Sequence, residues 1–108
     1  MNFKNLAQAK KSINIGDVVT IKKPLDSLEE ARKVTKKNTT SISTFSPNTR
    51  TWKGDIGCDI QLIWQKAKNT RIIGNKIQFI ANNEDNDQWQ IDRLKEMNID
   101  YWLEITIH

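Results

Sequence analysis

The fold prediction depends on one stretch of the chain, which reads Ser27-Leu-Glu-Glu-Ala-Arg-Lys-Val-Thr-Lys-Lys37. Its apolar members Leu28, Ala31 and Val34 recur at the spacing of one helical face. Glutamates stand at the beginning of the stretch and lysines at its end, and both placements suit the dipole of a helix. The stretch therefore predicts an amphipathic helix over residues 27–37.

Alternation of apolar and polar residues predicts strands on both sides of this helix. Helical spacing predicts a further helix near the C-terminus and a short amphipathic helix at the N-terminus. The strands are expected at 13–23, 58–65, 71–81 and 101–108, and the two outer helices at 1–12 and 89–98. Gly74 and Asn75 leave open whether 71–81 is one bulged strand or two strands joined by a turn.

The resulting order is an extra helix followed by β-α-β-β-α-β, which resembles the ferredoxin-like split β-α-β fold. In that fold, four antiparallel strands carry two helices on one face. A small SH3-like or OB-like barrel with helices is the alternative, because the stretch Ile15-Gly-Asp-Val-Val-Thr-Ile21 also resembles the first strand of an SH3-like barrel. The length of 108 residues fits a single domain over 1–108.

Residues 38–55 show no helical or strand period longer than a few residues. We therefore expect a long polar loop between the central helix and the next strand. Ordered domains rarely carry a loop of that length unless it has a function.

The composition argues against enzymatic and metal-binding functions. The chain has one cysteine, Cys58, which excludes an internal disulfide. Its one histidine, His108, is the last residue, so neither a histidine-dependent catalytic set nor a structural zinc site is expected. We expect no enzymatic activity, no metal and no cofactor. Without a signal-like stretch or a long apolar run, we expect a cytoplasmic protein that does not enter a membrane.

Charge is distributed unevenly along the chain, whose formal net charge is +4. Residues 1–76 carry a net charge of +9 and residues 77–108 a net charge of −5. Such asymmetry is found on surfaces that face nucleic acid, and equally on mixed solvated surfaces. The 15 Ile, 13 Lys and 11 Asn all use A/T-rich codons, which favours a phage or another mobile element as the source.

The basic residues of the first half, together with a tryptophan, predict a nucleic-acid-binding surface. Lysine and arginine would contact phosphates, and a loop tryptophan would stack on a base, which favours single strands. The residues assigned to this surface are Lys22, Lys23, Arg32, Lys33, Lys36, Lys37, Arg50, Trp52 and Lys53. The structural alternative is a solvated helix face, with Trp52 turned into the core.

A protein-binding module is the alternative function, for example a phage-encoded inhibitor of a host defence or nucleic-acid-processing complex. One candidate surface is a partly apolar, open sheet face, which would also allow a homodimer. The other is an acidic stretch before the last helix. The residues assigned to them are Ile63, Ile80 and Trp102 for the sheet face, and Glu84, Asp85 and Asp87 for the acidic stretch. Exposed tryptophans are enriched at interfaces.

Overall fold

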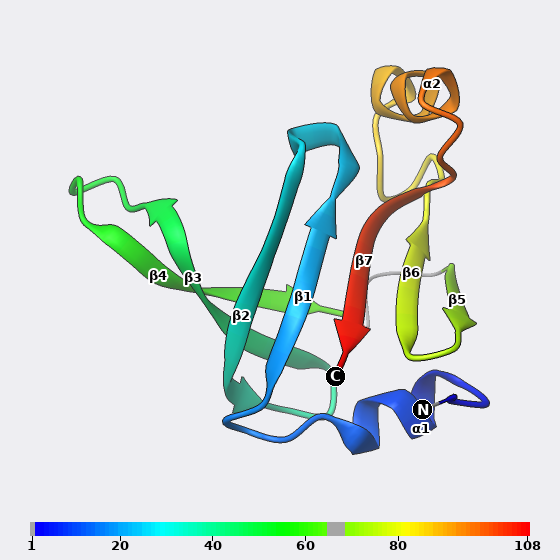
Figure 1. Cartoon of the computed structure of the whole chain (residues 1–108). Coiled ribbons are helices and arrows are strands. Elements are labelled where there is room, and N and C mark those ends of the chain that lie inside the picture. The colour runs from blue at the N-terminus through cyan, green and yellow to red at the C-terminus, as the bar shows by residue number, and fades with distance from the viewer. Residues whose placement is uncertain (1, 65–68) are drawn as a thin grey trace.

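The structure is a computed structural model, and it describes residues 2–64 and 69–108. Strands make up most of its regular structure (Figure 1). The strands are β1 (Val18–Lys23), β2 (Leu28–Lys37), β3 (Ser41–Arg50), β4 (Ile56–Ile63), β5 (Thr70–Ile73), β6 (Lys76–Ile80) and β7 (Tyr101–Ile107). The helices are α1 (Leu6–Ser12) and α2 (Gln88–Glu96), with a short 3-10 turn, η1 (Pro24–Asp26).

All seven strands belong to one antiparallel sheet with the order β4-β3-β2-β1-β7-β6-β5. Strands β1 to β4 follow one another along one half of the sheet. Strands β5 to β7 form the other half, and β7 pairs with β1 to join the two halves. The ferredoxin-like prediction is therefore wrong. The barrel alternative is wrong as well, because β4 and β5 are the edges of an open sheet.

The stretch predicted as a helix over 27–37 forms strand β2 instead. Glu30, Arg32 and Val34 are buried, whereas Ala31 and Lys33 between them are exposed. This alternation is hidden in the sequence because two of the three buried positions are charged. The two charges form an ion pair with each other, which offsets the cost of placing them in the interior.

Most of the loop expected at 38–55 is also strand, because residues 41–50 form β3. Ile42, Thr44 and Ser46 are its buried, alternating positions. Two of these three residues carry hydroxyl groups, so the strand period cannot be recognised from hydrophobicity alone.

The other predicted elements lie where the sequence places them. Helix α1 falls within the expected N-terminal helix, α2 overlaps the expected C-terminal helix, and β1, β4 and β7 overlap three expected strands. The chain turns at Gly74 and Asn75, so the stretch expected as strand at 71–81 forms the two strands of the β5–β6 hairpin. Gly74 has a φ of 61°, the left-handed conformation that such a turn uses.

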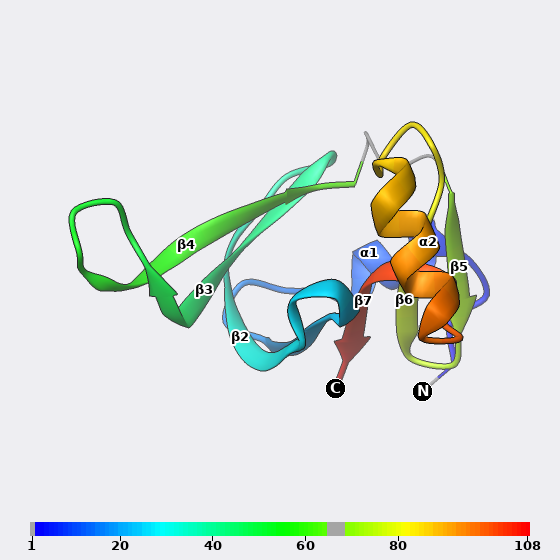
Figure 2. The ribbon, with the colours of Figure 1, turned by 90° about the horizontal axis from the view of Figure 1, so that it is seen from above.

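The sheet is strongly curled, which gives it an inner and an outer face. Strands β7 and β4 are separated by three other strands, a distance of about 19 Å in a flat sheet. Leu103 of β7 and Leu62 of β4 nevertheless line the same cavity. Figure 2 shows this bend from above, with the β3–β4 hairpin on one side and β5 to β7 on the other.

The inner face carries the hydrophobic core, and α1 closes it at the lower end in Figure 1. Ala9 of α1 and Ile13, which caps that helix, are fully buried in the core cluster. Trp64, which follows β4, packs in the same cluster, and the Lys10 Nζ atom lies 4.9 Å from the centroid of its ring. The strands contribute Val19, Ile21, Val34, Ile42, Ile77, Phe79, Leu103, Ile105 and Ile107.

Candidate functional site

The structure divides the predicted basic surface into separate regions. Three of its nine residues remain together, at the far end of the β3–β4 hairpin. The members lie as follows: Lys22 and Lys33 on the outer face, Lys23 and Arg32 beside the inner cavity, Lys36 and Lys37 at the end of β2, and Arg50, Trp52 and Lys53 at the hairpin tip. No single surface therefore presents the whole predicted set.

The end of the β3–β4 hairpin projects from the rest of the protein as a two-stranded arm, which we define as residues 46–58 (Figures 1 and 2). Its turn is fixed by hydrogen bonds around Thr51. The Thr51 N–H donates to the Asp55 carbonyl oxygen at 2.8 Å, and the Gly54 N–H donates to the Thr51 carbonyl oxygen at 2.9 Å. Gly54 has a φ of 92°, which favours glycine there.

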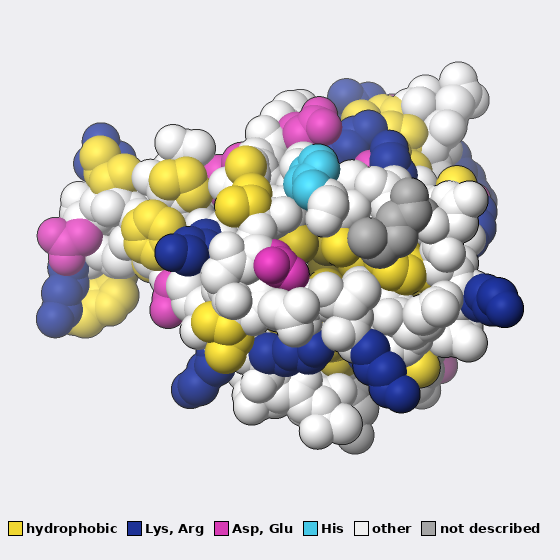
Figure 3. Space-filling view, turned by 60° about the horizontal axis from the view of Figure 1, so that its bottom comes forward, with side chains coloured by type: hydrophobic (Ala, Val, Ile, Leu, Met, Phe, Trp, Pro, Cys, Tyr) yellow, Lys and Arg dark blue, Asp and Glu magenta, His cyan; other side chains and the backbone are white. Residues whose placement is uncertain are grey.

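Trp52 stands at the tip of the arm with 91% of its surface exposed. The Lys53 Nζ atom lies 5.4 Å from the centroid of the Trp52 ring, within the range of a cation–π interaction. Arg50, at the end of β3, is exposed beside them. Figure 3 shows hydrophobic and Lys or Arg side chains at this projecting end, on the left of the view, together with an acidic side chain. The alternative of a Trp52 turned into the core is therefore wrong.

The arm also carries apolar side chains that the sequence reasoning missed. Ile56 is 63% exposed and pairs with Arg50 across the hairpin. Phe45, at the base of the arm, is 41% exposed, and its ring lies over Gly57. A Cβ atom on Gly57 would come within 2.7 Å of the Phe45 Cζ atom. The absence of a side chain at Gly57 thus allows the phenyl ring to lie close against the hairpin.

Two of the predicted nucleic-acid contacts are engaged within the protein. Arg32 is 4% exposed, and its Nε atom donates to Glu30 Oε1 at 2.5 Å. The Lys37 Nζ atom donates to the backbone oxygen of Ile13 at 2.6 Å, which links β2 to the end of α1. These two cations are less available to phosphates than the sequence suggests.

Glu30 is the centre of a buried polar cluster on the inner face. Its carboxylate accepts hydrogen bonds from Arg32, from Ser46 Oγ at 2.6 Å and from Asn48 Nδ2 at 3.1 Å. Burial acts to raise the pKa of Glu30, but these hydrogen bonds and the charge of Arg32 together hold the pKa below its ordinary value of 4.5. The cluster connects β2 to the base of the arm.

The outer face presents polar residues, and one row of them crosses five strands. In this row the directly paired residues are Glu29, Lys22, Glu104, Gln78 and Arg71, from β2, β1, β7, β6 and β5. Lys22 thus lies between two glutamates. Its contact with Tyr101 raises the pKa of Lys22 against the effect of burial, and both glutamates add to the rise.

Hydrogen bonds connect the far end of this row. Gln78 Nε2 donates to Glu104 Oε2 at 2.6 Å, and the Lys76 Nζ atom lies 3.6 Å from Glu104 Oε1. Arg71 donates to Gln78 and to both carboxylate oxygens of Asp100, at 2.9 and 2.8 Å. The hydrogen bonds from Arg71 hold the pKa of Asp100 below its ordinary value. The row gives the outer face compensated charges rather than a basic stripe.

The residues assigned to the alternative protein interface are also dispersed. Trp102 is half-buried on the inner side, where its ring centroid lies 5.6 Å from that of Phe79. A bulge in the β6–β7 pairing places it there, and Ile80 beside that bulge is half-buried. The side chain of Ile63 lies outside the described residues.

The predicted acidic stretch is largely used to start helix α2. Asp87 forms a capping box with Gln90, and Asp85 accepts a hydrogen bond from Asn82 at 2.8 Å. Glu84 is exposed in the turn before them. Trp89, in the first turn of α2, is 64% exposed and was not assigned to a surface. A tryptophan at a helix start gives no sequence signal for exposure.

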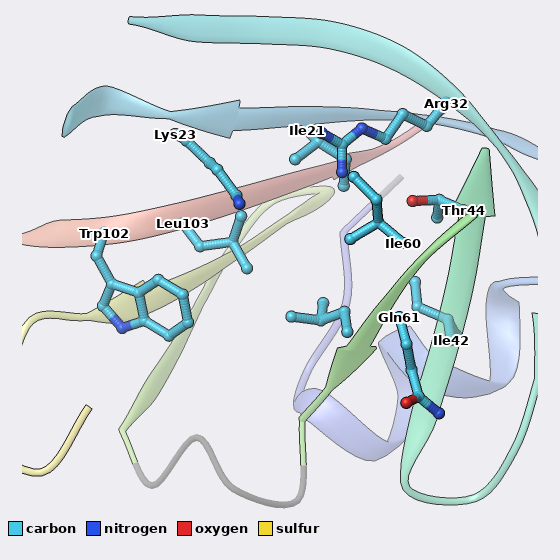
Figure 4. Close-up of a pocket in the computed structure, with 10 residues that line it drawn as sticks. Ile21, Lys23, Arg32, Ile42, Thr44, Ile60, Gln61, Trp102 and Leu103 are labelled. Atoms are coloured by element: carbon cyan, nitrogen blue, oxygen red, sulfur yellow. The ribbon is translucent and has the colours of Figure 1, made fainter. Parts of the chain in front are cut away.

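A cavity of about 310 Å³ lies on the inner face, between β1 and β7 on one side and β3 and β4 on the other (Figure 4). Its walls are mainly apolar, and Lys23, Arg32, Thr44 and Gln61 add polar groups. In Figure 4 the Lys23 and Arg32 side chains extend from the upper strands toward Leu103 and Ile60. Sequence reasoning did not predict this cavity.

Among residues 2–64 and 69–108, no three His, Cys, Asp or Glu side chains are grouped so that they could hold a metal ion. Neither helix of the described chain has the length and apolar character required to cross a membrane.

No protein-family model matches the chain, and no match was found among curated proteins or among solved structures.

Proposed function

We propose that the protein is a non-enzymatic binding module that holds single-stranded nucleic acid through the tip of the β3–β4 arm. The observation that carries the proposal is the 91% exposed Trp52 ring, which has Lys53 against it and exposed Arg50 two residues before it. An exposed aromatic ring offers a stacking surface to any base, and stacking contributes about 1–3 kcal/mol per base. Arg50 and Lys53 supply charges for the adjoining phosphates.

Single strands suit this arm better than a duplex. A single strand has unstacked bases that reach one aromatic ring, whereas a duplex keeps its bases stacked on one another. Two of the other predicted cations are matched by acidic residues within the protein. Lys22 lies between two glutamates, and Arg32 is paired with Glu30. We place such a module in the cytoplasm, encoded by a phage or another mobile element.

The test is fluorescence anisotropy with fluorescein-labelled single-stranded DNA, single-stranded RNA and duplex DNA between 50 and 200 mM salt. Trp52→Ala is expected to weaken single-strand binding about tenfold, from the loss of one stacked base. Arg50→Gln and Lys53→Gln should each reduce the slope of log affinity against log salt by about 0.7.

The matched controls lie on helix α2, away from the arm. Trp89→Ala removes another exposed tryptophan, and Lys95→Gln removes another exposed cation. Both variants should bind like the parent protein. Absence of binding at 50 mM salt, or equal losses from Trp52→Ala and Trp89→Ala, would rule out the proposed function.

Binding of a protein partner by the same arm is the second candidate function. It is favoured by the apolar side chains next to the tip, since Ile56 is 63% exposed and Phe45 is 41% exposed. Such a partner would offer an apolar pocket with an acidic rim, as an inhibited host nucleic-acid-processing enzyme could. Ile56→Ser separates the two functions. It should weaken a protein complex and leave nucleic-acid binding within about twofold of the parent, because a single serine substitution removes no phosphate contact.

A further inference from the structure

The cavity on the inner face has features of a small-molecule site that neither the arm nor the core explains. Its volume of about 310 Å³ is at the lower end of the range for ligand pockets, about 300–1,000 Å³. Side chains from both halves of the curled sheet line it. The apolar wall consists of Ile21, Ile42, Ile60, Leu62, Trp102 and Leu103. Most of the surface that a ligand would meet is therefore hydrocarbon.

Arg32 supplies the polar end of the cavity. Its side chain is 3% exposed, and only its Nε atom takes part in the ion pair with Glu30. The ion pair with Glu30 therefore does not use the two Nη groups. A guanidinium has five N–H donors, and a buried one normally uses more than one of them. Its two Nη groups lie side by side, which matches the spacing of the two oxygens of a carboxylate.

Lys23 adds a second positive charge to the cavity, whose lining residues include no Asp or Glu. It lies on β1 at the cavity wall, and Figure 4 shows its ammonium group directed into the same space as Arg32. The charges of Arg32 and Glu30 cancel in their ion pair, so the lining residues and Glu30 together carry one positive charge, that of Lys23. A monoanion would neutralise it, whereas a dianion would bring an excess negative charge into an apolar space.

We propose that this cavity binds a small organic monocarboxylate with a compact apolar body, such as an aryl or branched alkyl carboxylate. The carboxylate accepts hydrogen bonds from the Nη edge of Arg32, and Lys23 balances its charge. The body lies against Trp102 and Leu103. The site is separate from the arm, and its occupancy does not depend on nucleic-acid binding.

The experiment is a titration of the full chain followed by the methyl resonances of isoleucine and leucine in ¹H–¹³C spectra. Benzoate is the probe, and benzamide is its uncharged counterpart of nearly equal shape. Benzoate should shift the lining methyls of Ile21, Ile60 and Leu62 and leave those of the exposed Ile56 and Ile73 in place. Benzoate should bind at least about tenfold more tightly than benzamide, because hydrogen bonds to a charged group are the stronger ones.

Variants identify the site without disturbing the buried ion pair. Lys23→Gln should weaken benzoate binding about fivefold or more, whereas Lys33→Gln, on the outer face, should leave it unchanged. Ile60→Phe fills the cavity and should abolish the shifts, and its remaining resonances report whether the fold is kept. The proposal is overturned by equal binding of benzoate and benzamide, by shifts confined to other methyls, by no effect of Lys23→Gln, or by inorganic phosphate binding as tightly as benzoate.

Discussion

Glu30 is a charged residue at a position where the fold requires burial. Its carboxylate is satisfied by Arg32 on the same strand and by Ser46 and Asn48 from β3. A buried carboxylate with this many partners favours its ionised form, so that the native state holds its proton less tightly than the unfolded chain does. The stability of the protein is therefore linked to the ionisation of this one group.

We expect Glu30→Gln to lower the free energy of unfolding at pH 7 by about 3 kcal/mol, because Arg32 loses its buried partner. The lowered pKa of Glu30 means that its stabilising contribution is complete above its ordinary value of 4.5 and disappears as the pH falls through the lowered value. The difference between variant and parent should thus narrow from pH 5 to pH 3. Urea denaturation at several pH values measures it.

Glu29→Gln is the matched control, since Glu29 is the exposed neighbour on the outer face of β2. It should change the free energy of unfolding at pH 7 by no more than about 0.5 kcal/mol, as is usual for surface substitutions. A Glu30→Gln deficit that stays constant down to pH 3 would contradict the linkage.

Among the elements, the arm depends on two glycines with nearly the same positive φ and different surroundings. Gly54 has a φ of 92° and Gly57 a φ of 94°. A Cβ atom on Gly54 would meet nothing within 4 Å, whereas one on Gly57 would press against the Phe45 ring. The pair therefore separates the cost of the backbone conformation from the cost of the contact.

We expect Gly54→Ala to destabilise the hairpin by about 1 kcal/mol, the cost of a left-handed conformation in a residue with a Cβ atom. Gly57→Ala should cost about 1 kcal/mol more, because the Phe45 ring must move. Amide hydrogen exchange in β3 and β4 measures this local opening. Equal loss of protection in the two variants would show that the Phe45 ring moves aside without lowering the stability of the hairpin.

The elements that sequence patterns predict correctly are those whose buried residues are apolar. The alternation of Leu103, Ile105 and Ile107 identifies β7 directly. Strands β2 and β3 have the same alternation, but Glu30, Arg32, Thr44 and Ser46 occupy most of their buried positions. Their burial depends on hydrogen bonds formed within and between strands of the folded sheet. The local sequence pattern of one strand does not contain that information.

The candidate site was predicted only in part, because sequence patterns show which residues are neighbours along the chain and not which strands pair. Arg50, Trp52 and Lys53 are close in sequence, so their proximity follows from the chain itself. Lys22 and Arg32, in contrast, were grouped by assuming a helix, and the strand pairing separates their side chains onto opposite faces. The cavity could not be predicted, since it requires the curl that brings β4 near β7.

At the scale of the whole molecule, the β1–β7 pairing is the one seam between the two halves of the described sheet. It joins residues near opposite ends of the chain, as in the pairing of Val19 with Ile107. The hydrophobic core crosses the same seam, because the cluster contains residues of both halves. The two halves should therefore unfold together.

Ile105 lies at the middle of this seam, fully buried between Ile21 and Ile77. Ile105→Ala should lower the free energy of unfolding by about 2–5 kcal/mol, whereas Ile73→Ala, at a half-exposed site on edge strand β5, should cost less than about 1 kcal/mol. In urea, amide exchange of β3 and of β6 should accelerate together in Ile105→Ala. If β6 lost protection while β3 kept it, the two halves would be separate folding units. The arm would then belong to a unit that is stable without the C-terminal strands.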